Sequence, residues 1–217
     1  MARRISALRV GRGGRTVKVE LDGTESVPLT KAVAAGLRVG RQLDGPEIEK
    51  LTRESRVEDS YARCLGLLAR RPRSRAELER YLDGRKLAGE DRDAVLARLA
   101  ERGWVDDRAF ARQWIENRQE FRPRSGRALR MELQRFGVPE GQIREALEGM
   151  DDTAAARAAA RKKAPRLLRA AGKDPQARIV FERKMTAYLA SRGFDYDLSR
   201  ETARSVWAES SGGDENA

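Results

Sequence analysis

A repeated motif constrains the fold of this chain more than any other feature of its sequence. The pattern Ser-x3-Leu-x3-Leu-x4-Leu/Val runs from Ser74 to Leu87 and again from Ser125 to Val138. A weaker copy, with Phe, Met, Leu and Phe in the four positions, runs from Phe181 to Phe194. A period of about 50 residues is typical of a small helical unit that has been copied and stacked. One such unit cannot bury its own apolar face, so its neighbours must complete the core.

The residues around the motif predict three helices in each unit. Ser74 and Ser125 stand where helix N-caps are expected, and Glu77 occupies the capping-box position after Ser74. We expect the four leucines of the first two copies to be buried: Leu78, Leu82, Leu129 and Leu133. The predicted fold class is mainly α, with tandem three-helix repeats that form an elongated, curved array, and a small N-terminal β-hairpin extension.

Residues 1–29 carry the signals of strands. Val17, Val19 and Leu21 alternate with polar residues, and Asp22-Gly23 is typical of a two-residue hairpin loop. Gly11–Gly14 lacks the Gly-Lys-Ser/Thr ending of a phosphate-binding loop, so we interpret it as a hairpin turn. A short helix is expected from Thr30 as its cap, and strands are expected only within about residues 1–30.

A second helix start is predicted at Asp44-Gly45-Pro46-Glu47. The expected division places a β-rich extension at 1–45 and a first repeat with a lead-in helix at 46–106. The second and third repeats then occupy 107–150 and 151–209. Residues 210–217 are polar and predict a disordered tail.

Composition narrows the classes of function. The chain has no histidine, which removes Ser-His-Asp and Cys-His catalysis and the commonest metal ligand. Catalysis would then have to rest on carboxylates, lysine, tyrosine or serine. No apolar run is long enough to span a membrane, and no secretory signal is evident at the N-terminus. The single cysteine, Cys64, is expected in the core of a cytoplasmic protein. The net charge of +11 favours a polyanionic partner.

Four joined motifs resemble a known family. They are RSRAEL at Arg73–Leu78, GWVDDRAFA at Gly103–Ala111, RSGRAL at Arg124–Leu129 and LQRFGV at Leu133–Val138. Together they resemble the RecX family of regulators of the RecA recombinase; Phe136 departs from the pattern, which has a basic residue there. The resemblance implies an all-helical array of three-helix repeats in a non-enzymatic protein, with no catalytic residues, metal or cofactor, that binds the RecA filament along its helical groove. We also expect a monomer. It also implies inhibition of the ATPase, strand-exchange and coprotease activities of RecA in DNA repair and the SOS response. We further expect single- or double-stranded DNA as a partner.

Two basic tracts are the candidate partner-binding residues. The first surrounds the start of the second motif copy and contains Arg118, Arg122, Arg124, Arg127 and Arg130. The second lies on one predicted helix and contains Arg157, Arg161, Lys162, Lys163, Arg166, Arg169 and Lys173. Lys162, Arg166, Arg169 and Lys173 share a helical stripe that Pro165 is expected to kink or split. The alternatives are a solvated helix face for the second tract and, for the first, pairing within helices, for instance Glu116 with Arg112 or Glu120 with Arg124.

Two other clusters have structural interpretations. Asp106-Asp107 and Asp151-Asp152 stand at predicted helix starts, where carboxylates cap free N–H groups, so we do not interpret them as a metal site. Trp104 follows a glycine, as Val138 and Phe194 do, so we expect it in the core rather than stacked on bases.

The alternative function is direct DNA binding by helix-turn-helix-like units. A reader of bases uses Asn or Gln beside its arginines. The segments 76–82 and 127–133, which belong to the predicted second helices, contain neither amide.

Overall fold

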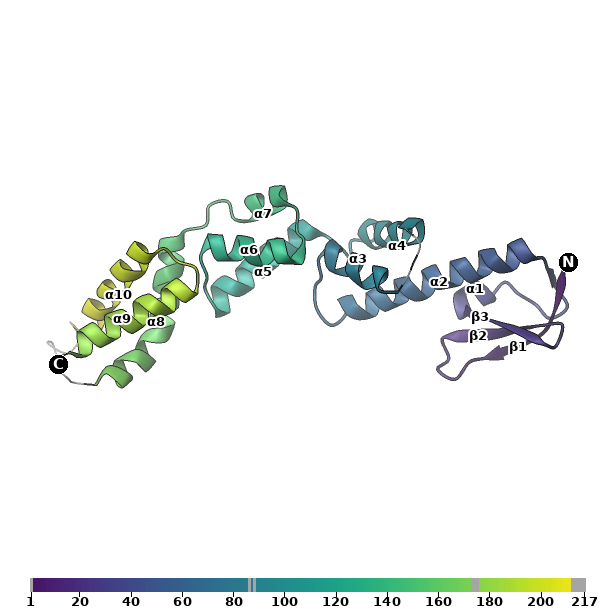
Figure 1. Cartoon of the computed structure of the whole chain (residues 1–217), viewed down its shortest axis with the longest axis horizontal. Helices are drawn as coiled ribbons and strands as arrows, with labels where there is room; N and C mark the ends of the chain where they lie inside the picture. Colours follow the sequence, from purple (N-terminus) through teal and green to yellow (C-terminus); the bar gives the residue numbers. More distant parts are fainter. Residues whose placement is uncertain (1, 86, 88, 173–175, 212–217) are drawn as a thin grey trace. The chain divides into compact units, whose positions relative to one another are not determined.

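The computed structural model describes residues 2–85, 87, 89–172 and 176–211 (Figure 1). The chain divides into two compact units, Met1–Asp106 and Asp107–Ala217. Strands occur near the N-terminus and the rest of the described chain is helical, which confirms the mainly α fold with a small N-terminal β region. None of the helices within the described ranges is both long and apolar enough to cross a membrane.

The first unit begins with an antiparallel sheet in the order β3-β2-β1-β4. Its strands are β1 (Arg3–Val10), β2 (Thr16–Leu21), β3 (Glu25–Thr30) and β4 (Gln42–Leu43). The prediction that strands end near residue 30 is wrong, because β4 pairs with Arg3 and Arg4 of β1. Two residues are too few to show the period-2 alternation from which strands are predicted.

The β1–β2 and β2–β3 loops are hairpin turns. Between β1 and β2 the N–H of Gly11 donates to the Thr16 carbonyl at 2.8 Å, which confirms that the glycine-rich segment is a hairpin turn. Between β2 and β3 the residues Asp22 and Gly23 have φ angles of 50° and 76°. Leu21 pairs with Glu25, so Thr24 also belongs to this loop, which is one residue longer than predicted.

Two helices complete the N-terminal layer, α1 (Lys31–Ala34) and α2 (Gly45–Leu68). Thr30 precedes α1, yet its side chain makes no capping hydrogen bond. Its N–H instead donates to the Ser55 hydroxyl of α2 at 2.7 Å and so ties β3 to that helix. One face of the sheet packs on α2 through a cluster of buried side chains: Ile5, Val19, Leu21, Leu29, Ala34, Leu37 and Leu43.

Helix α2 is continuous for 24 residues and belongs to two cores. It begins as predicted, since the Asp44 carboxylate accepts from the N–H of Glu47 at 2.8 Å. Its second half packs against α3 (Arg75–Asp83) and α4 (Gly89–Glu101). The buried residues of this second cluster are Tyr61, Cys64, Leu78, Leu82, Val95, Leu96, Leu99 and Val105. Ser74 caps α3 in a complete capping box with Glu77, as predicted.

The second unit begins with α5 (Asp107–Phe121), α6 (Gly126–Phe136) and α7 (Glu140–Ala146). The Ser125 hydroxyl caps α6 by accepting from the N–H of Ala128. Leu129 and Leu133 are fully buried, like Leu78 and Leu82, so all four core leucines are confirmed. They pack with other buried residues of these helices and of the α6–α7 turn: Phe110, Ala111, Ile115, Val138 and Ile143.

The last three helices are α8 (Asp152–Ala171), α9 (Ala177–Ser191) and α10 (Tyr196–Ser211). The weak third copy of the motif is buried here, at Phe181, Met185, Leu189 and Phe194. Pro165 lies inside α8 and does not split it. Ala164 and Leu167 beside it are buried, so packing holds the helix together where one N–H is missing. Helix α10 includes Ser210 and Ser211 of the expected tail, and 212–217 lie outside the described residues.

The start of α6 contacts the turn between α9 and α10. The Ser125 hydroxyl donates to the Gly193 carbonyl at 2.7 Å while it caps α6. Gly193 has φ +90°, and a Cβ there would lie 2.6 Å from the Cβ of Ala128 and 2.7 Å from the Ser125 oxygen. Only glycine fits this turn, because both its backbone angle and its close approach to α6 exclude a side chain.

Candidate partner-binding surface

Two arginines of the first tract are engaged with one glutamate. Arg118 of α5 and Arg124 of the α5–α6 loop lie 2.9 and 3.0 Å from the two carboxylate oxygens of Glu132 on α6. The Trp114 indole N–H also donates to Glu132, at 2.7 Å, and the Arg118 guanidinium lies 4.3 Å from the Trp114 ring centroid. The Glu132 side chain is only 14% exposed, so this network joins α5 to α6. Arg118 and Arg124 therefore stabilise the packing of α5 against α6.

Sequence reasoning missed Glu132 and proposed Glu120 as the partner of Arg124. That pairing is wrong because Arg124 lies beyond the end of α5, in the loop that turns toward α6. Glu132 lies on α6 one residue before the buried Leu133, and nothing in the sequence indicates that it meets α5. The contact depends on how two helices pack, which local spacing does not encode.

Arg127 and Arg130 lie on the other side of α6. They line a hollow of about 360 Å³ together with Gly126, Leu147, Met150 and Asp152. Arg130 lies 3.3 Å from Glu140 in an exposed ion pair. Arg127 is exposed, with no side-chain partner within the described part of the chain. The Asp152 carboxylate accepts from the Gly126 N–H at 2.8 Å, so it occupies the N-terminus of α6.

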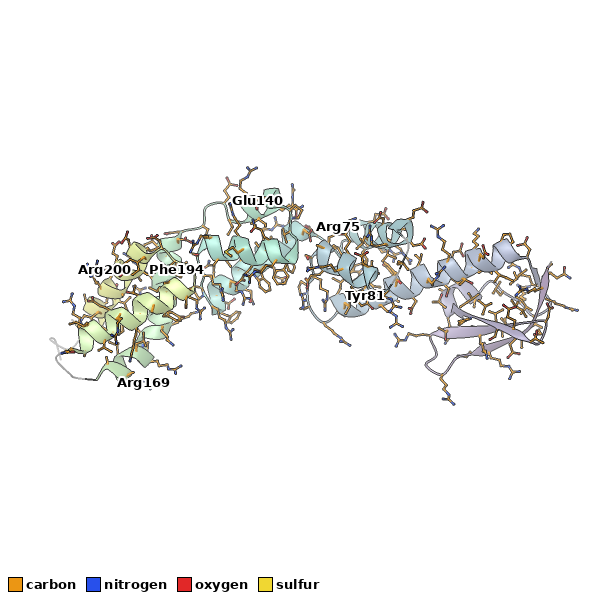
Figure 2. The ribbon with its side chains drawn as sticks, in the orientation of Figure 1. Arg75, Tyr81, Glu140, Arg169, Phe194 and Arg200 are labelled. Carbon is orange, nitrogen blue, oxygen red and sulfur yellow. The ribbon has the colours of Figure 1, made fainter. Side chains whose placement is uncertain are left out.

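Arg122 lies in the loop after α5, and the end of α5 contacts the basic flank of α8. Lys162 donates to the backbone carbonyl of Glu120, near the end of α5. This contact turns the flank of α8 that carries Lys162 toward the α5–α6 loop, where Arg122 is exposed. Arg166 and Arg169 follow at the i+4 and i+7 positions on the same flank and are also exposed. Figure 2 shows Arg169 at the outside of the α8–α10 bundle, whereas Phe194 lies within it.

We name Arg122, Lys162, Arg166 and Arg169 the α8 row. The neighbours of Lys162 on the chain face elsewhere. Arg161 lies 3.3 Å from Glu209 of α10, and Arg157, one turn earlier, is exposed. The half-buried Lys163 places its ammonium 5.1 Å from the Tyr188 ring centroid of α9. Lys173, the last residue of the predicted stripe, lies outside the described residues.

The acidic pairs act at helix starts, as predicted. Asp151 accepts from the N–H groups of Thr153 and Ala154 at 2.8 and 3.1 Å, and α5 begins at Asp107. These carboxylates stabilise helix N-termini.

The prediction for Trp104 is wrong, since its side chain is 56% exposed. Its N–H donates to the Leu99 carbonyl as that of Val138 does to Leu133, so the turn is the same. That turn, however, follows the third helix of its repeat, whereas Val138 and Phe194 follow the second helix. Val105, the next residue, enters the core instead.

Cys64 and Glu77, which belong to the α2–α4 core region, have shifted pKa values. Burial raises the pKa of the Cys64 thiol to about 11, so the thiol is neutral and unreactive at physiological pH. Burial also opposes the charge of Glu77, but hydrogen bonds from Arg71 and from the Ser74 N–H prevail and lower its pKa. Both groups thus serve the structure.

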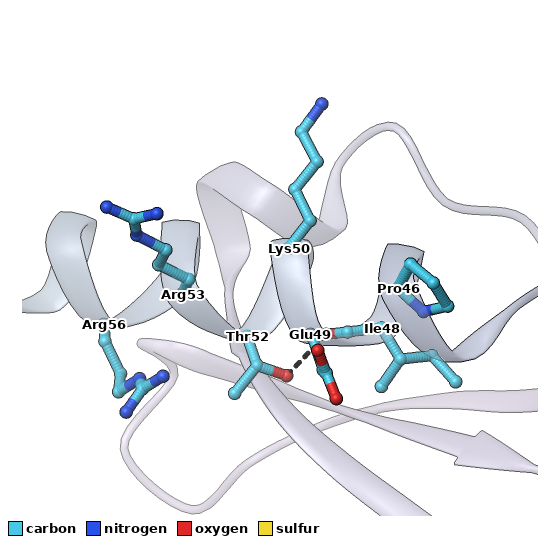
Figure 3. Close-up of a pocket in the computed structure, with 7 residues that line it drawn as sticks. All are labelled: Pro46, Ile48, Glu49, Lys50, Thr52, Arg53 and Arg56. Atoms are coloured by element: carbon cyan, nitrogen blue, oxygen red, sulfur yellow. Dashed lines mark hydrogen bonds between the residues drawn. The ribbon is translucent and has the colours of Figure 1, made fainter.

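The first unit has a hollow of about 550 Å³ along α2 (Figure 3). Its lining residues are Pro46, Ile48, Glu49, Lys50, Thr52, Arg53 and Arg56. Lys50 and Arg56 extend to opposite sides of the helix, and Thr52 donates to the Ile48 carbonyl. Arg53 is held by Asp91 and Glu90 of α4, at 2.5 and 3.0 Å. The charges here are dispersed and partly paired, unlike the α8 row.

Comparisons with known proteins agree with the repeats. The model of the first three-helix domain of RecX matches residues 61–99, and that of the second matches residues 106–147. The Regulatory protein RecX of Thermobifida fusca is 38% identical over 154 residues, which cover 68% of this chain and 80% of that protein. That of Chlorobaculum tepidum is 35% identical over 158 residues, which cover 73% and 94%.

Two solved structures share the fold. A crystal structure of regulatory protein RecX superposes with a TM-score of 0.64 at 22% identity, covering 90% of this chain and 96% of that one. RecX from Lactobacillus salivarius gives a TM-score of 0.55 at 17% identity, covering 69% and 96%. At these identities the likeness concerns the fold alone.

Proposed function

Because this chain belongs to the RecX family, we propose that it is a regulatory protein that binds the filament of the RecA recombinase. Binding inhibits the ATPase, strand-exchange and coprotease activities of the filament, and so modulates recombinational repair and the SOS response. The protein acts in the cytoplasm, as a monomer and without a cofactor. The relatives are named regulatory proteins rather than enzymes, which agrees with a role through binding.

The observation that carries the proposal at the level of residues is the α8 row. Arg166 and Arg169 are exposed on one flank of α8, and Arg122 is exposed in the α5–α6 loop that Lys162 of this flank approaches. None of the three arginines has an acidic partner within the described ranges. A nucleoprotein filament presents acidic protein surface and DNA phosphates along a continuous path. Arginine suits both, since its planar guanidinium binds carboxylate and phosphate with two hydrogen bonds.

Direct reading of DNA by a helix-turn-helix-like unit is the second candidate. Helix α6 extends to Phe136 and so includes Gln134, an amide beyond the segment considered from the sequence. Its side chain, however, donates to Glu140 at 3.1 Å. Glu132 and its arginines fill another side of this helix. These contacts favour binding to a filament over reading of base edges by α6.

The test is a triple charge reversal in the α8 row, Arg122→Glu with Arg166→Glu and Arg169→Glu. Lys162 stays unchanged because it contacts the backbone of α5. Charges at the rim of an interface chiefly change the association rate and its salt dependence, so inhibition of the DNA-dependent ATPase of RecA should need roughly tenfold more variant at low salt. The difference should shrink as salt is added.

A matched control reverses three exposed arginines of the same unit, Arg144, Arg183 and Arg200, and changes the net charge equally. Far-UV circular dichroism checks that both variants keep their helices. If the α8 variant inhibits like its control at every salt concentration, the row has no part in the complex. If it loses only binding to naked DNA, the row contacts DNA and the contact with RecA lies elsewhere.

A further inference from the structure

The N-terminal sheet carries a second basic surface, at the end where β1 turns into β2. Arg12 and Arg15 lie in the glycine-rich turn, and Lys18 follows on β2. Lys31, the first residue of α1, donates its N–H to the Arg15 carbonyl at 3.1 Å, so it belongs to the same end. All four side chains are exposed and have no side-chain partner within the described part of the chain. We name these four residues the hairpin patch.

The strand register places one more cation, Arg9, beside the hairpin patch. Arg9 of β1 pairs directly with Lys18 of β2 on the face opposite the core, whose side is marked by buried Val19. Two like charges in directly opposed positions destabilise a sheet. Glu20 offsets part of this repulsion, since it lies 3.0 Å from Arg9. A bound anion between the strands would relieve the rest.

Two other acidic groups of the sheet lie at its far end. Glu25 pairs with Arg3, and the Asp22 carboxylate accepts from the backbone N–H of Arg4. Between Val10 and Val19 the sequence holds three cations and no acidic residue. The sheet is therefore polarised, with its uncompensated positive charge gathered around the β1–β2 turn.

We propose that the hairpin patch binds the phosphate backbone of nucleic acid. Its chemistry fits phosphates better than a protein surface. Residues 2–60 contain no Phe, Tyr or Trp, so this end lacks the aromatic anchors on which protein interfaces depend, and the exposed Val10 is a small substitute. Three glycines in the turn let the backbone and both arginines approach a phosphate closely.

The same lack of aromatic residues favours binding of double-stranded over single-stranded nucleic acid. Binding of single strands draws much of its energy from bases stacked on aromatic rings, which the sheet cannot supply. Contacts to phosphates alone favour the duplex, where the charge density is highest. The patch thus acts without sequence preference, as a contact separate from the α8 row and independent of whether the chain binds RecA.

The test is duplex binding by the full chain, with no recombinase present. The variant combines Arg12→Gln, Arg15→Gln and Lys18→Gln, and fluorescence anisotropy with a labelled duplex of mixed sequence gives the affinity across a salt series. Each phosphate contact contributes about 0.9 to the slope of log affinity against log salt, so the slope should fall by about 2 to 3. The affinity near 50 mM salt should fall about tenfold or more.

The control removes three exposed cations of the same unit, with Arg38→Gln, Lys50→Gln and Arg56→Gln. It loses the same charge but leaves the hairpin patch intact, and its slope should change by less than about 1. Equal slopes for the two variants would show that only total charge matters and would overturn the proposal. A second result would also overturn the proposal: poly-glutamate binds the parent as tightly as the duplex does, and the patch variant loses affinity for both polyanions equally. The patch would then bind carboxylates as well as phosphates.

Discussion

Gly193→Ala is the substitution whose effect the structure specifies most closely. A residue with a Cβ at φ +90° carries strain of about 1–2 kcal/mol. The added methyl would also lie 2.6 Å from the Cβ of Ala128 and 2.7 Å from the Ser125 oxygen. The Ala128 Cβ is fixed to the backbone of α6, and the Ser125 oxygen is held by two hydrogen bonds, so the contact between α6 and the α9–α10 turn must shift, at a further cost of about 1–3 kcal/mol. The free energy of unfolding should fall by about 2–5 kcal/mol.

Gly149→Ala is the matched control for this prediction. Gly149 has φ +73° in the same unit, and a Cβ there meets nothing within 4 Å. It carries the backbone strain without the collision, so its cost should stay at about 1–2 kcal/mol. Urea unfolding followed by far-UV circular dichroism compares the two variants. Adding Ala128→Gly to Gly193→Ala should recover part of the loss. Equal destabilisation by the two glycine substitutions would refute the packing argument.

Two further predictions concern the cores of the repeats. Leu129→Ala should lower the free energy of unfolding by about 2–5 kcal/mol, because Leu129 is fully buried. Met131→Ala, on the exposed side of α6, should change it by less than about 0.5 kcal/mol. An unchanged urea midpoint for Leu129→Ala would contradict the burial of this residue. The pKa of Glu77 is lowered in the fold, so its charge stabilises the protein above the ordinary carboxyl range and this stabilisation disappears as pH falls through the lowered pKa. Glu77→Gln, which keeps a capping-box side chain, should therefore melt below the parent at pH 7, and the gap should narrow as the pH falls below the ordinary carboxyl range. A gap of constant size over an acid titration would argue against the charge.

The sequence predicted those parts of the fold that depend on neighbours along the chain. Ser74, Ser125 and Asp44 start helices because a cap acts on N–H groups two or three residues away. The core leucines follow from helical periodicity. Trp104 shows the limit of such reasoning, since its local turn matches that of Val138 and only its place after the third helix exposes it.

The candidate site was less predictable because it depends on contacts between helices. Both basic tracts were evident as runs of arginine and lysine. Which members stay exposed is decided by Glu132, which engages Arg118 and Arg124, and by the carbonyl of Glu120, which orients Lys162. None of these pairings has a helical or strand spacing, so no periodic pattern could reveal them.

The 24-residue helix α2 couples the N-terminal sheet to the first repeat, so the sheet cannot be added or removed without a change to the core of that repeat. Arg53 reaches forward to Asp91 of α4, while Ser55, farther along the chain, reaches back to Thr30 of β3. The two sets of contacts interleave within a single turn, so the helix has no segment that belongs to neither core. One inserted residue there would rotate one core against the other by about 100° and break contacts of at least one of them. Helix α2 therefore connects the sheet and the first repeat and tolerates no change in its length. A chain that began at the start of α2 would leave Ile48 and Leu51 without the sheet that covers them.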